Sequence, residues 1–123
     1  MLEDKKKWRL LRDLKKGKFC YLIGVENWAI ELQKSEFNSL YFLLLRINEQ
    51  LLDIKDELMD EEFITLELEQ LPWYIVLEGK KNEWSLRFVF ESKDQTRSFE
   101  MYWPIPIAQY LFFEIKKMWE STD

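Results

Sequence analysis

Apolar residues in the first half of the chain recur at the spacing of one helix face. Between residues 35 and 59 they follow one another in alternating steps of three and four, which predicts a long amphipathic helix. Ser35 is a good N-cap, and Glu36 adds a favourable carboxylate to the first turn. Residues 40–45 are apolar on every side of this helix, which favours contact with a second subunit. The apolar seam comprises Phe37, Leu40, Leu44, Ile47, Leu51, Ile54 and Leu58.

Period-two alternation elsewhere predicts six β-strands. Turns at 80–83 and 92–96 set Leu77 opposite Leu86 and Phe88 opposite Met101, with all four side chains on one face. This agreement predicts an antiparallel four-stranded meander, preceded by an N-terminal hairpin. The six strands span residues 19–23, 28–32, 63–68, 73–78, 84–90 and 97–103.

A second, shorter helix follows the last strand. Pro104 and Pro106 end that strand, and an apolar stripe then continues at helical spacing to Trp119. The predicted order is ββα-ββββ-α, which places the chain in the α+β class. We expect one domain over residues 1–123, with residues 1–18 as a basic N-terminal lead.

The composition excludes several catalytic designs. The chain has no histidine, one cysteine (Cys20) and three widely separated glycines. Catalytic triads and Cys-His pairs need a histidine, and phosphate-binding loops need clustered glycines. We therefore expect no enzyme activity, no cofactor and no catalytic or metal-binding residues. With 47% hydrophobic residues the chain can bury a core, whereas no apolar run is long enough for a membrane span, so we expect a cytoplasmic protein.

The charge is divided unevenly along the chain. Residues 1–18 carry a net charge of +5, whereas the whole chain carries −5, so the remaining residues carry −10. This basic lead either folds back on the acidic body or attracts nucleic acid, anionic lipid or an acidic partner. Its candidate contact residues are Lys5, Lys6, Lys7 and Arg9.

The outward face of the predicted sheet is a second candidate surface. By strand parity it carries Tyr74, Arg87 and Tyr102, and aromatic rings beside an arginine can stack nucleic-acid bases. The same face carries Glu78 and Glu100, which can instead hold Arg87 in an ion pair.

An acidic cluster lies at the end of the long helix. Its spacing places carboxylates on shared helix faces, close to the unfavourable end of the helix dipole. It is interpreted as a solvated or salt-bridged helix end, as a partner docking surface, or as a Mg²⁺ or Ca²⁺ site. The residues are Asp53, Asp56, Glu57, Asp60 and Glu61.

Several of these segments together resemble a known family. Trp28-Ala29-Ile30-Glu31-Leu32, Glu57-Leu58-Met59-Asp60-Glu61-Glu62 and Trp84-Ser85-Leu86-Arg87 are similar to an uncharacterised family of small proteins from cyanobacteria and plastids. The resemblance implies a fold similar to that of the plant Whirly proteins, which are single-stranded-nucleic-acid-binding regulators, and it implies a dimer. It carries no established site residues.

Three functions are compatible with these patterns. A non-enzymatic homodimer that acts as a protein-interaction or regulatory module agrees best with the all-round apolar helix segment and the acidic body. A weak single-stranded nucleic-acid-binding protein is the first alternative, because of the basic lead. A carboxylate-based metal-dependent enzyme is the second alternative.

Overall fold

Two antiparallel sheets and two helices make up the part of the chain that the structure, a computed structural model, describes: residues 8–25 and 27–121. The three-stranded sheet has the order β1-β2-β3, and the four-stranded sheet has the order β4-β5-β6-β7. The mixed α+β class is confirmed. The elements are β1 (Trp8–Arg12), β2 (Tyr21–Val25), β3 (Trp28–Leu32), α1 (Lys34–Lys55), β4 (Ile64–Gln70), β5 (Trp73–Lys80), β6 (Glu83–Glu91), β7 (Ser98–Trp103) and α2 (Ile107–Glu120).

The register of the four-stranded sheet matches the register deduced from the sequence. Leu77 pairs with Leu86, and Phe88 pairs with both Ile75 and Met101. These side chains point into the core, because the pleat sends alternate residues to opposite faces. The outer face therefore carries the polar set, with Arg87 directly opposite Tyr102 as expected.

Strand β1 is the main difference from the sequence-based expectation. The basic lead was expected to precede a two-stranded hairpin, but Trp8–Arg12 pairs with β2 and completes a third strand. Trp8 and Leu10 pack against the core. Arg12 donates a hydrogen bond to the Met118 carbonyl oxygen at 3.2 Å, near the carboxyl end of α2, where a cation is favourable. The exposed Leu11 and the inward Arg12 break the alternation of apolar and polar residues by which a strand is predicted from sequence.

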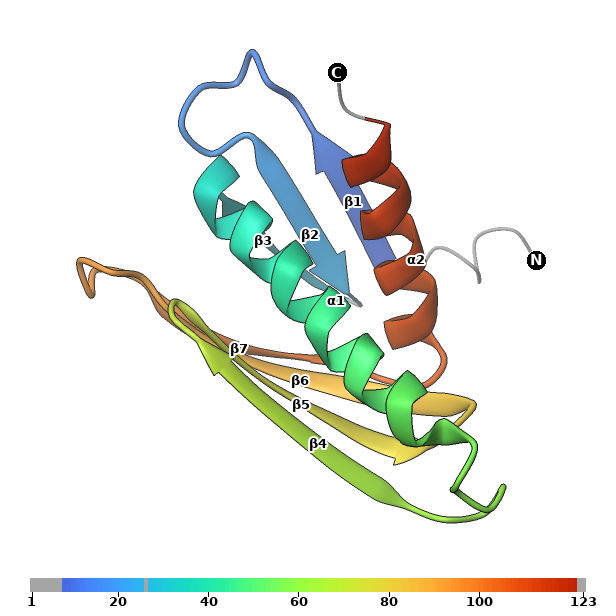
Figure 1. Ribbon diagram of the computed structural model, residues 1–123. Coiled ribbons are helices and arrows are strands. Elements are labelled where there is room, and N and C mark those ends of the chain that lie inside the picture. Colours follow the sequence, from blue (N-terminus) through green and yellow to red (C-terminus); the bar gives the residue numbers. More distant parts are fainter. Residues whose placement is uncertain (1–7, 26, 122–123) are drawn as a thin grey trace.

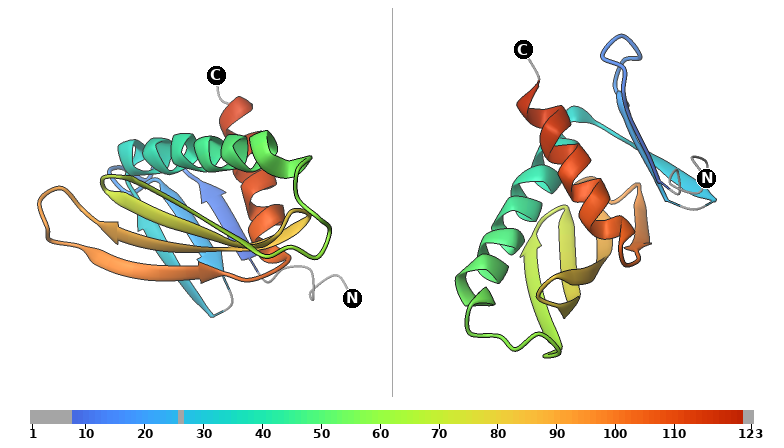
Figure 2. Two further views of the ribbon diagram at one scale, coloured as in Figure 1. Left: turned by 60° about the horizontal axis from the view of Figure 1, so that its bottom comes forward. Right: turned by 90° about the vertical axis from the view of Figure 1, so that its right-hand side faces the viewer.

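Helix α1 lies against both sheets (Figure 1). Its N-cap is Gln33 rather than the expected Ser35, and Lys55 is its last residue, four residues before the expected end at Met59. Phe37 stacks on Tyr21 of β2 with ring centroids 4.0 Å apart, while the Trp73 indole N–H of β5 donates to the Glu36 carbonyl oxygen at 2.9 Å. Helix α1 therefore contacts both sheets, which Figure 2 shows as separate layers. Helix α2 does so as well, through β1 and β6.

The apolar seam of α1 packs mainly into the core of the same chain. Leu40, Leu44, Ile47 and Leu51 are buried, as expected. Leu43, on another side of the helix, is buried as well, because the helix contacts elements on more than one side. Much of the all-round apolar character is thus used within the chain, and Phe42 stays 47% exposed.

Replacing an inward residue of β6 should cost far more stability than replacing its outward neighbour. Phe88 is fully buried, so Phe88→Ala should lower the free energy of unfolding by ~3–5 kcal/mol through lost contacts and a cavity. Val89→Thr, on the opposite face, should cost less than ~1 kcal/mol. Chemical denaturation of both variants measures the difference, and equal losses would contradict the assigned strand parity.

Candidate functional site

A single arginine, Arg97, connects the two sheets and the start of α1. Its Nη1 lies 2.7 Å from Oε2 of Glu36, and its Nη2 donates to the Glu31 carbonyl oxygen of β3 at 2.8 Å. The guanidinium also lies over two aromatic rings, 4.7 Å from the Phe19 centroid and 5.2 Å from the Phe90 centroid. Stacking and ion pairing together hold the guanidinium in one orientation.

Glu36 contributes to two structures at once. Its Oε1 accepts the Gln33 backbone N–H at 2.9 Å, which caps the amino end of α1, while its other oxygen binds Arg97. The Glu36 side chain is only 9% exposed and that of Arg97 is 28% exposed. Because a buried carboxylate needs a partner, the helix start and the position of Arg97 depend on each other.

The loop between β6 and β7 sets the position of Arg97. Asp94 Oδ1 accepts the Thr96 hydroxyl at 2.7 Å and the Ser92 hydroxyl at 2.8 Å, and it also accepts the Thr96 N–H at 3.1 Å. These hydrogen bonds, with those from Thr96 the strongest cause, lower the pKa of Asp94 from 3.8 to about 2. The Asp94 carboxylate is therefore ionised, and its hydrogen bonds stabilise the turn itself.

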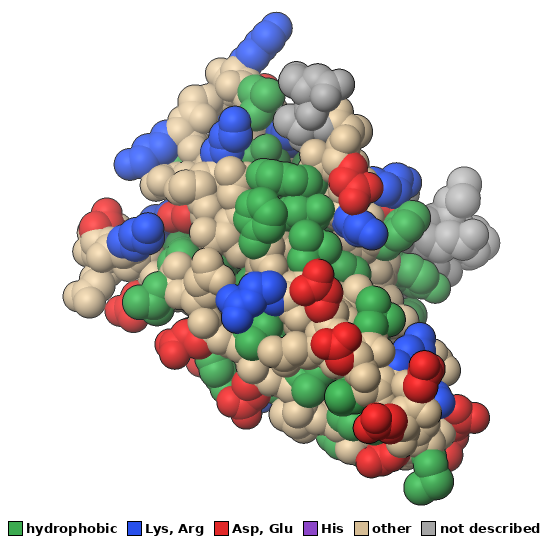
Figure 3. Space-filling view, viewed as in Figure 1, with side chains coloured by type: hydrophobic (Ala, Val, Ile, Leu, Met, Phe, Trp, Pro, Cys, Tyr) green, Lys and Arg blue, Asp and Glu red, His purple; other side chains and the backbone are tan. Residues whose placement is uncertain are grey.

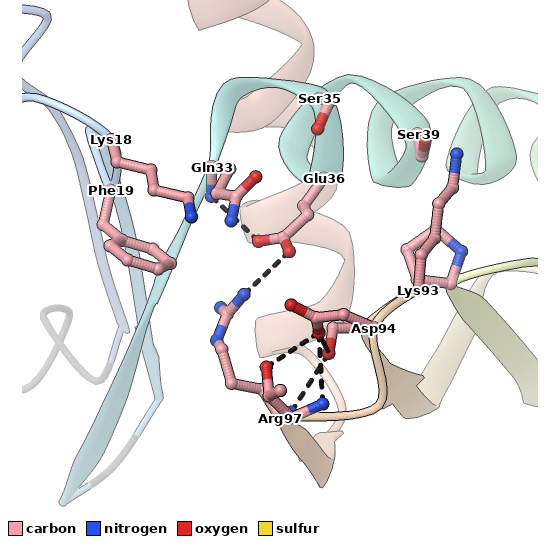
Figure 4. A pocket seen from close by; sticks show the side chains of 12 residues that line it. Lys18, Phe19, Gln33, Ser35, Glu36, Ser39, Lys93, Asp94 and Arg97 are labelled. Atoms are coloured by element: carbon pink, nitrogen blue, oxygen red, sulfur yellow. Dashed lines mark hydrogen bonds and ion pairs between the residues drawn. The ribbon is translucent and has the colours of Figure 1, made fainter.

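A polar cavity of about 310 Å³ lies between this loop, the start of α1 and the β1–β2 loop. Figure 4 shows the Lys93 side chain directed toward the turn of α1 that carries Ser39, with Lys18 on the other side of the cavity. Both carboxylates of the lining, Glu36 and Asp94, already accept hydrogen bonds from the protein itself. This region is therefore the place where the β6–β7 loop, the start of α1 and the β1–β2 loop meet.

The outward sheet face keeps its predicted residues close together, but Glu67 and Glu78 already bind Tyr74 and Arg87. The Tyr74 hydroxyl donates to Glu67 Oε1 at 2.8 Å, and this hydrogen bond is the main cause that raises the pKa of Tyr74. Arg87 Nη2 lies 3.9 Å from Glu78 Oε1, which agrees with the ion-pair interpretation. Tyr102 is 49% exposed beside Arg87.

The acidic cluster is only partly neutralised, and its partners come from the β5–β6 hairpin. Lys80 Nζ lies 2.7 Å from Glu61 Oε1, and Lys81 Nζ lies 3.2 Å from Asp60 Oδ1. Within the described residues, no group of three or more potential ligands could hold a metal ion. The other three carboxylates, on exposed residues at the end of α1, are those of Asp53, Asp56 and Glu57.

The basic lead is divided by strand β1. Arg9 lies on the exposed side of β1, opposite Gly24, and Lys16 forms an ion pair with Glu31. The candidate contacts Lys5, Lys6 and Lys7 lie outside the described residues.

Aromatic side chains also gather where α1 and α2 lie side by side. Trp119 of α2 stacks on Tyr41 with ring centroids 4.8 Å apart and meets Phe42 edge-on at 5.4 Å. Burial, followed by the charge of Glu120, raises the pKa of Tyr41. Figure 3 shows apolar side chains in the middle of this face, surrounded by charged ones. We call Phe42, Trp119 and the half-buried Leu45 the helix patch.

These features define an α+β protein whose two antiparallel sheets are joined by both helices and by Arg97. Residues 3–118 match a family described as a domain of unknown function, DUF1818, and the chain belongs to this family.

A solved structure is similar to this chain over nearly the whole length of both proteins. It is a protein of unknown function from Prochlorococcus sp. NATL2A, described as a member of the DUF155 family. The two are 37% identical with a TM-score of 0.84, and the alignment covers 92% of this chain and 93% of the other. This agrees with the expected uncharacterised cyanobacterial family. No functionally curated protein shows significant similarity. No helix of the described residues is long and apolar enough to cross a membrane.

Removing the Arg97 guanidinium should destabilise the protein and uncouple Glu36. Arg97→Met keeps an apolar stem between the two rings, so its cost of ~2–3 kcal/mol in unfolding free energy should come from the unpaired Glu36 carboxylate. Adding Glu36→Gln, which keeps the capping acceptor, should recover part of that loss.

Arg87→Met is the matched control for this double-mutant cycle. Arg87 is 51% exposed in its ion pair, so its removal should cost less than ~1 kcal/mol. Additive losses at positions 36 and 97 in urea denaturation would contradict the coupling.

The Asp94 turn should lose its stabilising effect in acid. Because the folded-state pKa of about 2 lies below the ordinary 3.8, ionised Asp94 stabilises the fold above about pH 4. That contribution is lost as the pH falls toward 2. The melting temperature of Asp94→Asn should therefore lie below that of the parent at pH 5, and the gap should narrow by pH 2.5. A gap independent of pH would contradict this assignment.

Proposed function

We propose that this protein is a non-enzymatic homodimer that acts as a protein-interaction or regulatory module. The observation that carries the proposal is the helix patch: Phe42 and Trp119 form an aromatic pair at the surface, and Phe42 is 47% exposed. Exposed aromatic residues beside buried neighbours are typical of interface centres.

A second copy of the chain is the occupant that fits this patch. Glu49, one helix turn from Leu45, and Lys116, one turn from Trp119, are exposed residues with opposite charges. In a two-fold dimer the same surface meets itself, so Glu49 of each protomer can approach Lys116 of the partner subunit. The patch is therefore complementary to itself in both apolar character and charge.

A second group of exposed aromatic residues lies on another side of α2. Tyr110 and Phe113 are each 57% exposed, one helix turn apart, and the Lys117 amine lies 5.3 Å from the Phe113 ring centroid. An exposed aromatic stripe on a helix costs solubility unless a partner covers it. Because nine residues turn a helix by about 180°, Tyr110 lies on the side of α2 opposite Trp119, so this stripe is separate from the helix patch.

The nucleic-acid alternative has weaker support. Arg87 and Tyr102 are neighbours on an open sheet face, but Glu78 already pairs with Arg87 and the exposed Glu100 lies on the same face. Phosphate binding needs an excess of positive charge, and this face has an excess of negative charge. We therefore rank a Whirly-like role in single-strand binding below the interaction module.

A charge placed in the helix patch should separate the dimer. Sedimentation velocity at tens of micromolar should show a dimer for the parent and a monomer for Phe42→Asp, because the interface would then bury an unpaired carboxylate. Tyr102→Asp, at a residue of similar exposure on the other side of the four-stranded sheet, should stay dimeric.

A charge swap refines the same test. Glu49→Lys alone should weaken the dimer, and adding Lys116→Glu should restore it. A parent protein that is monomeric throughout this concentration range would overturn the proposal.

A further inference from the structure

Strand β3 is an edge of the three-stranded sheet, and β7 is an edge of the four-stranded sheet. These two edge strands border the same groove. Trp28 of β3 shares one cavity of about 450 Å³ with Tyr102 of β7, whereas Glu31 shares another, of about 550 Å³, with Ser98. The start of β3 therefore lies near the end of β7, and the end of β3 near the start of β7. The strands run antiparallel along the groove without pairing, since they belong to different sheets.

The backbone of β7 points unpaired groups into this groove. Glu91 N–H bonds to Pro72 on the β5 side of β6, whereas Ser92 N–H bonds to Arg97 on the β7 side. This alternation makes Phe88 and Met101 a hydrogen-bonded pair of the β6–β7 ladder. The amides and carbonyls that point to the free edge of β7 are consequently those of Ser98, Glu100 and Tyr102.

Strand β3 also has backbone groups that point into the groove. One of them already accepts a hydrogen bond, as it would from a partner strand. Arg97 Nη2 donates to the Glu31 carbonyl oxygen, so that carbonyl points away from β2 and toward the groove. By the same alternation, the backbone groups of Ala29 face the groove as well. The guanidinium closes one end of the groove and leaves the rest of the edge available.

We infer that the groove between β3 and β7 binds an extended segment of a partner protein, which adds as a strand to the free edge of β7. Exposed edge amides are the usual template for such strand addition. The groove is thus the surface on which the proposed interaction module would bind its partner. The inference depends on the two sheets and not on formation of the dimer.

The side chains beside the groove define the partner's chemistry. Side chains of an added strand that lie opposite Glu100 and Tyr102 point to the outer face, where Glu100 and Glu91 are exposed carboxylates. Arg87 lines the same cavity, but Glu78 already pairs with it. The intervening side chains point inward, toward the half-buried Ile30 and Phe99. The fitting segment therefore alternates basic and apolar residues, and its basic side chains can also lie over the Trp28 and Tyr102 rings.

Fluorescence anisotropy with a short labelled peptide that alternates lysine and valine tests this inference. The parent protein should bind it with micromolar affinity, and a peptide that alternates glutamate and valine should not bind. Methylating the backbone amides on one edge of the lysine peptide, and in a second version those on the other edge, keeps its charge but removes strand hydrogen bonds. One of the two versions should bind at least about tenfold more weakly.

Two protein variants locate the binding site. Glu100→Lys should weaken binding about tenfold, because it reverses a charge at the groove. Glu69→Lys makes the same change at an exposed residue of β4, the opposite edge strand of the same sheet, and should have little effect. Equal losses from the two variants, or unchanged binding of both methylated peptides, would show charge attraction without strand addition and overturn the inference.

Two further measurements separate this inference from its rivals. Phe42→Asp should bind the lysine peptide as the parent does, so a failed dimer and a failed groove give different results. A single-stranded oligonucleotide that competes fully with the peptide would assign the groove to nucleic acid and overturn the peptide inference. Absence of binding at millimolar peptide would overturn it as well.

Discussion

The ion pair between Arg97 and Glu36 is the contact on which the arrangement of the two sheets depends. Arg97 enters from the β6–β7 loop, and Glu36 is both its partner and the cap of α1. Phe19 brings the β1–β2 connection to the same guanidinium, and the Glu31 carbonyl brings β3. Each of these groups would lose a buried or half-buried partner if the arginine moved. The angle between the sheets is thus set by polar contacts as well as by apolar packing.

Local patterns were sufficient to predict the four-stranded sheet and both helices. Residues such as Phe88 and Leu86 alternate cleanly, and hairpin turns fix which residue faces which. The same logic failed at β1, where Leu11 is exposed and Arg12 points inward to meet α2. Its inward position depends on a carbonyl 106 residues away, which no local pattern contains.

The candidate site was the part least accessible from sequence. Glu36 was recognised only as a favourable charge in the first helical turn, and Arg97 only as the start of a strand. They are 61 residues apart, and nothing in either neighbourhood marks the other as its partner. In contrast, Arg87 and Tyr102 could be predicted to lie opposite each other, because one hairpin turn fixes the register of every pair along its two strands. The ion pair between Arg87 and Glu78 then limits what that face can bind.

The contact between Arg12 and Met118 affects the order in which a nascent chain can fold. Strand β1 leaves the ribosome well before α2, yet each packs against the other. The three-stranded sheet therefore lacks its contacts with α2 until α2 has also been synthesised. Throughout that interval, Trp8 and Leu10 lack part of their apolar surroundings. The packing of β1 is consequently completed only after α2 has left the ribosome.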